Sequence, residues 1–401
     1  MRSRNVRAFT QVESRTLGVA VVAATTMAAL MAALACTAGD RPATPESFAH
    51  SVTIDSVGYR AMPRLALRHV ATICGEERRP AQCPRNPIHV AIAGPNGSVY
   101  LAEKGTVLRQ FDEHGAYMRI VGNSGTDSGQ YQGVDAASYD GGARIHVFDQ
   151  STLQLLTYDT ASRHLGTMRV LLTHDYVGAK GSPDGLVMLS VPPAKHENDR
   201  VAARLDAADA ASGKRHRVAV VDARASRIEG KDLQPMRPFF LPRPVWAAGR
   251  DHSIIYAAGE NEYIARYDTA GQPKLLVKFA VPPVPISEAE VEREKKRIAA
   301  LFTGEWRASA QPYIDSAAAR SPRYHAVFTD LAILDDGSLW IRESPEAEAD
   351  SVRWDVLDVD GAPLGFAMLP NESRVTGGRL EHLQVVTESA LNIFVVQPVL
   401  P

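Results

Sequence analysis

Short apolar runs separated by tight polar turns recur along most of the chain. The turns Asn96-Gly97, Asp140-Gly141 and Asp184-Gly185 follow a constant step (97 to 141 to 185), and the motif returns at Asp251 and Asp336. Each turn precedes a run rich in Val, Ile, Leu, Tyr or Phe, which is the composition of β-strands. Asp and Asn accept backbone N–H bonds in turns, and Gly adopts positive φ at little cost. The pattern predicts antiparallel hairpins repeated at a fixed period.

A period of about 44 residues with two turn signals per unit is typical of the four-stranded blade of a β-propeller. Five units are clear, and a weaker sixth occupies residues 380–396 and ends before an outer strand. Residues 65–73 form an apolar run before the first unit and have no blade of their own. We therefore expect an all-β, six-bladed propeller closed by this N-terminal strand. Closure also removes an exposed sheet edge.

The first unit carries a family resemblance. Residues 88–122, with Gly94-Pro95-Asn96-Gly97, and the Gly-rich connection 122–131 resemble an NHL-type blade and its linker. The chain as a whole resembles the six-bladed β-propeller lipoproteins of bacteria, a family of unassigned activity. The resemblance implies the fold and an envelope location, and it implies no reaction.

Two segments break the period. Residues 195–217 are expected to form a long β-hairpin or loop that projects from blade three. Residues 282–322 are expected to form a helical insertion between blades four and five, because Ser287 and Glu290 have the spacing of a capping box. The helix is predicted to dock on the ring through an apolar stripe, extended by two aromatic residues. The predicted docking residues are Val291, Ile298, Leu301, Phe302, Trp306 and Tyr313.

The N-terminal 36 residues have the order of an export signal. Four Arg and one Glu precede an uncharged apolar run at 17–34, which ends in Ala33-Leu34-Ala35-Cys36. The segment resembles a bacterial lipoprotein signal, which would leave a lipidated Cys36. Cleavage by the ordinary signal peptidase, giving a soluble periplasmic or secreted protein, and an uncleaved anchor both stay open. Residues 37–60 are expected to be a flexible tether and 61–401 the propeller.

Export would place Cys74 and Cys83 in an oxidising compartment, which favours a disulfide between them. Closing a loop of this size contributes roughly 2.5–3 kcal/mol in the chain-entropy model. The chain has 44 Lys and Arg against 46 Asp and Glu, and removing residues 1–35 leaves 40 against 45. The near balance of charge in the whole chain argues against binding nucleic acid through a basic surface, and the acidic mature body is not expected to hold itself on an anionic membrane without lipid. We expect a monomer.

Chemical signatures are sparse. The chain has no His-Glu-x-x-His, no Gly-x-Ser-x-Gly and no Gly-Lys-Ser/Thr motif. Propellers bind ligands where the innermost strands converge, and the candidate inner strands are 88–92, 134–137, 176–179, 245–248, 329–333 and 380–385. Their polar and aromatic members are the candidate channel-mouth residues His89, Asp135, Trp246, Asp330, Glu381 and His382. These side chains either bond neighbouring blades or converge on a ligand or a cation.

The leading hypothesis is an exported binding or scaffold module in the cell envelope. Its partner would be a protein, a peptide or a glycan, and lipid on Cys36 would attach it to the membrane. The alternative is a metal-assisted hydrolase or lyase at the channel mouth, which the metal content of the purified protein would test. No cofactor is predicted. Calcium is the candidate ion at the channel, calcium or zinc would be sought in the metal analysis, and the residues that would hold a metal are not identified from the sequence.

Overall fold

The computed structural model describes residues 42–75, 80–172, 176–193, 200–224, 236–259, 263–280, 283–345 and 349–398. Ala43–Pro401 form one compact unit. The predicted signal segment with Cys36 lies outside the described residues.

Six four-stranded antiparallel sheets are the blades of a propeller, numbered here along the chain. Blade one is β3 (Ile88–Ala93), β4 (Val99–Glu103), β5 (Arg109–Phe111) and β6 (Tyr117–Ile120). Blade two is β9 (Ala136–Tyr139), β10 (Arg144–Asp149), β11 (Gln154–Asp159) and β12 (His164–Arg169). Blade three is β13 (Tyr176–Ser182), β14 (Gly185–Ser190), β15 (Arg200–Asp209) and β16 (Lys214–Arg224). The short parallel pair β7 (Asn123–Ser124) and β8 (Gln130–Tyr131) lies in the Gly-rich connection between blades one and two.

The second half of the ring repeats this order. Blade four is β17 (Val245–Ala248), β18 (Ile254–Ala257), β19 (Tyr263–Tyr267) and β20 (Pro273–Phe279). Blade five is β21 (Phe328–Ile333), β22 (Leu339–Glu343), β23 (Ser351–Leu357) and β24 (Pro363–Pro370). Blade six is β25 (Ser373–Arg379), β26 (His382–Thr387), β27 (Ala390–Pro398) and β2 (Leu65–Ile73).

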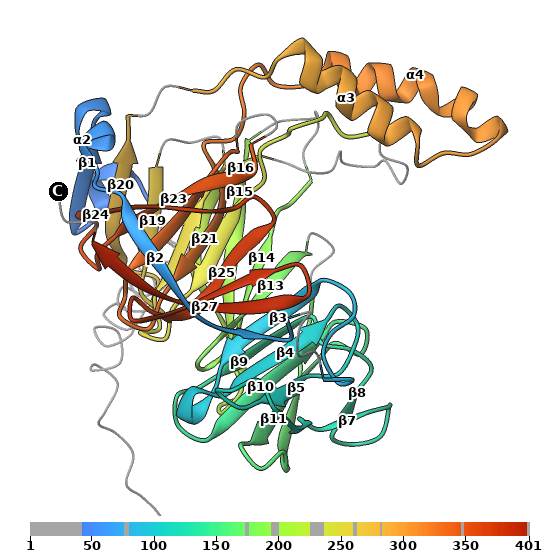
Figure 1. The fold of residues 1–401 in the computed structure, drawn as a ribbon, viewed down its shortest axis with the longest axis vertical. Coiled ribbons are helices and arrows are strands. Elements are labelled where there is room, and N and C mark those ends of the chain that lie inside the picture. Colours follow the sequence, from blue (N-terminus) through green and yellow to red (C-terminus); the bar gives the residue numbers. More distant parts are fainter. Residues whose placement is uncertain are drawn as a thin grey trace, which may run out of the picture. The chain divides into compact units, whose positions relative to one another are not determined.

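The N-terminal strand closes the ring, as the sequence predicted. β2 pairs antiparallel with β27 along its whole length, from Leu65 opposite Pro398 to Ile73 opposite Leu391. Figure 1 shows the blue β2 beside the red β27. The disulfide Cys74–Cys83, also predicted, follows β2 directly and joins it to the segment that leads into blade one. Both cysteines are buried, so the bridge lies at the closing point of the ring.

The core lies between the blades. Among the described residues, each of six apolar clusters combines side chains from two neighbouring sheets. The cluster between blades six and one contains Ile73 and Leu391 from the closing sheet with Ile88 and Phe111 from blade one. Because every pair of adjacent blades buries such a cluster, each blade is packed against a neighbour on both sides. In a closed ring of six blades, blades one and four lie opposite each other.

Aspartate turns end many hairpins, as their spacing in the sequence indicated. Asp112 Oδ1 accepts hydrogen bonds from the backbone N–H groups of His114 (2.9 Å) and Ala116 (2.8 Å). The carboxylates of Asp159 and Asp358 accept the same two bonds in blades two and five. The carboxylate thus replaces water for N–H groups that the ladder leaves unpaired.

The predicted inner strand at 380–385 is wrong. The inner strand of blade six is β25, and residues 382–385 belong to the second strand, β26. β25 contains Gly377 and Gly378, whose φ values are 154° and 98°, and its register shifts beside them. These glycines interrupt the apolar alternation that marks a strand, so the more regular β26 carries the stronger strand pattern in the sequence.

The segment predicted at 195–217 forms a long β-hairpin where the structure describes it, which is one of the two forms expected, but it is part of blade three and not an insertion. β15 and β16 pair through ten registered positions and are the two outer strands of blade three. The extra length between blades three and four therefore lies after Arg224, and 236–244 is the part of it that the structure describes. Long strands rich in Ala, Arg and Asp resemble a surface loop in composition, which explains the error.

The second insertion forms two helices where one was predicted. α3 (Glu288–Ala299) begins with the capping box of Ser287 and Glu290, and α4 (Glu305–Ala319) returns beside it (Figure 1). Val291, Ile298 and Phe302 pack against α4 and residues 236–240. The apolar stripe of α3 is therefore covered by the second helix of the insertion and by the connection before blade four. Leu301, Trp306 and Tyr313 are 68%, 76% and 60% exposed, which contradicts their predicted contact with the ring. Within the described ranges, no helix combines the length and apolar composition needed to cross a bilayer.

The predicted tether is shorter than 37–60. η1 (Pro45–Ser47), β1 (His50–Ile54) and α2 (Ser56–Ala61) belong to the compact unit. β1 adds a fifth strand, parallel to β20, at the outer edge of blade four. Asp55 caps α2 by accepting from the N–H groups of Val57 and Gly58. The polar composition of this segment hid a strand that forms only because an existing edge offers hydrogen bonds.

Candidate functional site

The inner strands surround a cavity of about 430 Å³ in the central channel, lined from the start of β3, β9, β13 and β25 to the last residues of β17 and β21. Most of its ionisable side chains lie where the inner strands begin. All six blades contribute to it, through β3, β9, β13, β17, β21 and β25 or the residues just before them. Most of the lining is small and apolar. The ionisable side chains around the cavity are His89, Lys104, Asp135, Tyr176, Lys180, Asp330 and Arg374. We call this cavity the channel mouth.

Arg374 joins the two blades at the closing point of the ring. Its guanidinium donates hydrogen bonds to the backbone carbonyls of Ile88 and of His89, the latter at 3.3 Å from Nη1. Burial lowers the pKa of Arg374, while the carboxylate of Asp330 raises it. The side chain stays a cation at neutral pH, because an arginine pKa begins so high. It therefore places a fixed positive charge at the mouth.

His89 lies beside Asp135 across the junction of blades one and two. His89 Nε2 is 3.1 Å from the backbone oxygen of Asp135, so Nε2 carries the proton and donates. Burial lowers the pKa of His89, the charges of Arg374 and Lys104 lower it further, and Asp135 opposes them. The imidazole is therefore neutral at neutral pH, and its Nδ1 is an acceptor. The Asp135 carboxylate accepts from the backbone N–H of Gln150 at 2.8 Å.

Two further side chains complete the polar rim. Asp330 is half-buried at the start of β21, and its Oδ1 accepts from the N–H of Leu331 at 2.9 Å. Burial raises the pKa of Tyr176, and the nearby charge of Asp135 raises it further. Tyr176 is thus a neutral phenol that can donate. The channel mouth offers donors from Arg374 and Tyr176 and acceptors from Asp330 and Asp135.

The structure brings three of the six predicted residues together. His89, Asp135 and Asp330 line the channel mouth. Trp246 is buried in β17 and lines a neighbouring groove, while its neighbours Ala247 and Ala248 line the channel mouth. Glu381 and His382 lie at the β25–β26 turn, at the other end of the inner strand from the mouth, because the inner strand of blade six was misplaced.

Sequence reasoning missed Arg374, Tyr176 and Lys104. Tyr176 opens a strand that was correctly placed, so its position alone was a sufficient signal. Arg374 alternates with the buried Ser373 and Val375 in β25, a pattern that the glycines after it made hard to see. Lys104 follows β4, in the turn toward β5, and reaches the mouth from outside the inner strands.

The described residues contain no cluster of three or more His, Cys, Asp and Glu side chains with the proximity that a metal ion requires. His89, Asp135 and Asp330 share a cavity without forming such a cluster. The expectation of calcium at the channel stays untested.

Arg250 lies across the far end of the channel. It sits in the β17–β18 turn of blade four, and its Nη2 donates to the carbonyl of Ala93 in the opposite blade at 3.1 Å. Its Nε pairs with Asp335 of blade five at 3.0 Å, and its guanidinium lies 5.5 Å from the ring centre of Tyr139 in blade two. Burial raises the pKa of Asp335, against the charges of Arg250 and Arg379. Four blades therefore meet at one guanidinium, which narrows the channel away from the mouth.

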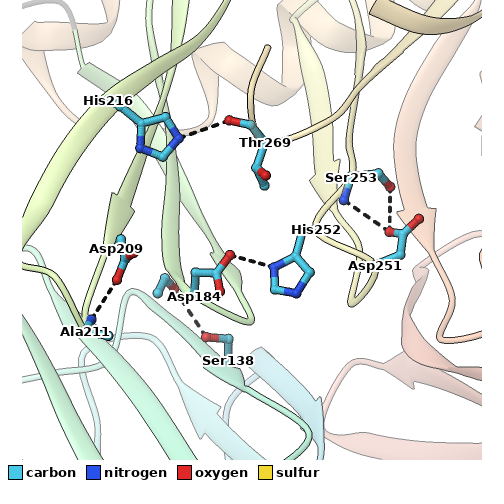
Figure 2. A network of polar contacts seen from close by, with 10 residues as sticks. Ser138, Asp184, Asp209, Ala211, His216, Asp251, His252, Ser253 and Thr269 are labelled. Atoms are coloured by element: carbon cyan, nitrogen blue, oxygen red, sulfur yellow. Dashed lines mark hydrogen bonds and ion pairs between the residues drawn. The ribbon is translucent and has the colours of Figure 1, made fainter. Parts of the chain in front are cut away.

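A second polar network joins blades three and four at the other end of β13 (Figure 2). The ring of His252 faces the carboxylate of Asp184, with Nδ1 and Oδ2 2.5 Å apart. A ring nitrogen of His216 lies 3.0 Å from the carbonyl oxygen of Thr269. These residues border a cavity of about 200 Å³ between the two blades. The imidazoles and Asp184 bond partners on the neighbouring blade, so the network links the blades.

No protein-family model matches the chain, and no curated protein matches it. Similar solved structures include a member of the DUF4221 family from Bacteroides vulgatus, with a TM-score of 0.49 and 9% identity over 84% of this chain and 100% of that one. A proposed exported protein from Bacteroides fragilis has a TM-score of 0.45 and 10% identity over 87% and 99%. Virginiamycin B lyase from Staphylococcus aureus has a TM-score of 0.38 and 9% identity over 82% and 99%. We draw nothing about activity from similarities this weak, and the propeller assignment rests on the strand pairing above.

Proposed function

We propose that the protein is an exported binding module that holds a peptide or a glycan of the cell envelope at the channel mouth. The supporting observation is that six inner strands, one from each blade, surround a single cavity with a polar rim. Its volume of about 430 Å³ lies within the range of small-ligand sites. A rigid ring suits such a role, since the binding groups are positioned before the ligand arrives.

The rim chemistry indicates the kind of ligand. A cation at Arg374 and a carboxylate at Asp330 face the same cavity, with the neutral phenol of Tyr176 between the strands. A ligand that carries both donors and acceptors would satisfy these groups. Peptide ends and sugar hydroxyls are such ligands, whereas a purely apolar ligand would displace water from Asp330 and Tyr176 and offer them no hydrogen-bond partner in exchange.

Export is supported by the order of charge and apolar residues before Cys36 and by the Cys74–Cys83 disulfide. Lipid on Cys36 would hold the acidic body at a membrane. Metabolic labelling of cells with a fatty-acid analogue tests this part: label is expected on the wild type and lost in Cys36→Ser. Equal labelling of the two proteins would contradict lipidation at Cys36.

Calorimetric titration of the purified protein with a panel of short peptides and oligosaccharides tests the binding site. The best ligand is expected to lose at least tenfold in affinity in Asp330→Asn and in Tyr176→Phe, which remove one charge and one donor with little change of shape. Asp184→Asn is the matched control, because it changes a carboxylate on the opposite end of the strands. Absence of millimolar binding across the panel, or equal affinity in all four proteins, would refute the proposal.

A further inference from the structure

A groove of about 840 Å³ lies between the helical insertion and the ring. One wall is the described connection between blades three and four, which contains Phe239, Phe240 and three prolines. The opposite wall is the C-terminal half of α3 with Ile298, and Leu301 and Phe302 just after it. Both walls are mainly apolar. We call this cavity the insertion groove.

The insertion groove is built from anchored parts. The base of the insertion is a pair of extended segments, in which the N–H of Ile286 donates to Arg323 (3.0 Å). The residues after α4 hold the wall formed by the connection between blades three and four. The N–H of Phe239 donates to Ser321 Oγ at 3.1 Å, and Arg320 donates to the carbonyl of Met236 at 2.7 Å. The groove is therefore formed before any ligand binds.

The insertion groove continues into the channel mouth. Tyr176 and Val177, at the start of β13, line both cavities. A ligand held at the mouth can thus extend along the groove toward Leu301, which is 68% exposed at the end of α3. This geometry fits an extended chain rather than a compact molecule.

The groove also contains a buried donor. Trp246 lines it and is only 8% exposed, and its indole Nε1 has no hydrogen-bond partner among the described residues. A buried N–H without an acceptor costs free energy. Beside it, Phe240 has a φ of 54°, an unusual conformation for an aromatic residue and one that occurs often at ligand-binding positions.

The charge of the lining is positive. Arg237, Arg243 and Arg297 border the groove with one acid, Glu294, which pairs with Arg297 at 2.6 Å. Burial lowers the pKa of Arg237, and the charge of Arg243 lowers it further, so the two guanidinium groups repel each other. A negative charge placed between the walls would be attracted to Arg243.

We propose that the insertion groove binds an extended, acidic peptide segment of a partner protein, with apolar side chains against Phe240 and Leu301 and carboxylates beside Arg243. This inference rests on the proposed function, since it extends the ligand of the channel mouth into the groove. A peptide is favoured over an anionic lipid because Arg237 and Arg243 lie at both ends of an apolar run in the groove wall, which suits a chain with several carboxylates, whereas an anionic lipid carries its charge at one end.

Fluorescence anisotropy with three labelled nonapeptides tests the inference. Each probe contains three Leu-Ala-X repeats, with X as Glu, Lys or Ser. The Glu probe is expected to bind at least tenfold more tightly than the Lys probe and to weaken as salt rises. Arg243→Gln and Leu301→Ser are each expected to weaken the Glu probe threefold or more. The matched controls, Arg60→Gln and Val57→Ser on α2, change exposed residues outside the groove and are expected to bind as the wild type does.

Equal binding of the three probes, or equal loss in the α2 controls, would overturn the inference. Tight binding to vesicles of anionic phospholipid that is lost in Leu301→Ser, without binding of the Glu probe, would assign the groove to lipid and overturn it as well. Asp330→Asn separates the two proposals. If a mouth ligand binds and responds to Asp330→Asn while the Glu probe does not bind, only the groove inference fails. If the Glu probe binds through Arg243 and no ligand responds to Asp330→Asn, the groove stands and the proposed function fails.

Discussion

Blade five contains a buried acid pair that makes the stability of the ring depend on pH. Glu343, at the end of β22, accepts a hydrogen bond from the Tyr59 hydroxyl at 2.5 Å, and Asp355 on β23 accepts from Arg353 Nε at 2.7 Å. The Arg353 guanidinium lies 4.0 Å from the ring centres of both Tyr59 and Phe366. Arg353 donates to Asp355 Oδ1, whereas Oδ2 is buried and has no donor among the described residues. A protonated Glu343 is the group that can donate to Oδ2.

The protonation of Glu343 follows from its surroundings. Burial raises the pKa of Glu343 to about 8, and the charge of Asp355 and the hydrogen bond to it act in the same direction. An unfolded glutamate titrates at 4.5. Between these values the folded protein holds one more proton than the unfolded chain. The free energy of unfolding is therefore highest below pH 4.5 for this group, falls as pH rises toward 8, and levels off above it.

The perturbation is Glu343→Gln, whose amide donates to Asp355 and accepts from Tyr59 without titrating. At about 1.36 kcal/mol per unit, the displacement of the pKa corresponds to about 5 kcal/mol. Water entry and relaxation of the surrounding side chains, with Arg353 Nε already 3.5 Å from Glu343 Oε1, will reduce the measured difference to roughly 2–4 kcal/mol. The variant is expected to gain this much relative to the wild type between pH 5 and pH 8.5.

Urea unfolding at half-unit steps from pH 5 to pH 8.5 measures the difference between the two proteins. Taking the difference cancels the histidines, which titrate in the same window. Glu372→Gln changes an exposed acid near the end of the same blade and is expected to keep the wild-type slope. A difference between Glu343→Gln and the wild type that does not change with pH would show that Glu343 is ionised in the folded protein.

Two further predictions concern the closing point and the turns. Cys83→Ser should lower the free energy of unfolding, measured by urea titration, by about 3 kcal/mol because it removes the disulfide. Dithiothreitol should lower the free energy of unfolding of the wild type and leave that of the variant unchanged. Equal sensitivity of both proteins to the reductant would contradict a stabilising bridge. Gly271→Ala should cost about 3 kcal/mol or more in thermal or urea unfolding, since φ is 81° and a Cβ would lie 2.0 Å from the Val218 carbonyl oxygen. Gly141→Ala, with φ of 79° and no atom within 4 Å, should cost only about 1 kcal/mol, and a similar loss in both variants would refute the steric argument.

The repeat pattern determined the fold because it is local. A turn such as Asp112 to Ala116 forms from its own carboxylate and backbone, and the apolar runs between turns have strand composition wherever they lie. The same reasoning placed the closing strand, since an apolar run without a blade at one end complements a blade without an outer strand at the other. The capping box of α3 and the Cys74–Cys83 pair are local in the same sense.

The expectations that failed depended on contacts between distant residues. β1 forms because the edge of β20 is free to accept it, and β25 is the inner strand because it packs at the channel despite its two glycines. The exposure of Trp306 follows from where α4 meets α3, which no single helix pattern contains.

The candidate site divides in the same way. The sequence by itself determined that His89, Asp135 and Asp330 open inner strands, because strand position can be counted from the turns. Only the tertiary structure decided that Arg374 faces them across the closing point and that Arg250 spans the far end of the channel. Arg374 reaches blade one from the adjacent blade six, and Arg250 reaches blade one from the opposite blade four. In both cases the residues that meet are far apart in the sequence. Ring geometry, rather than local pattern, sets which side chains share a cavity.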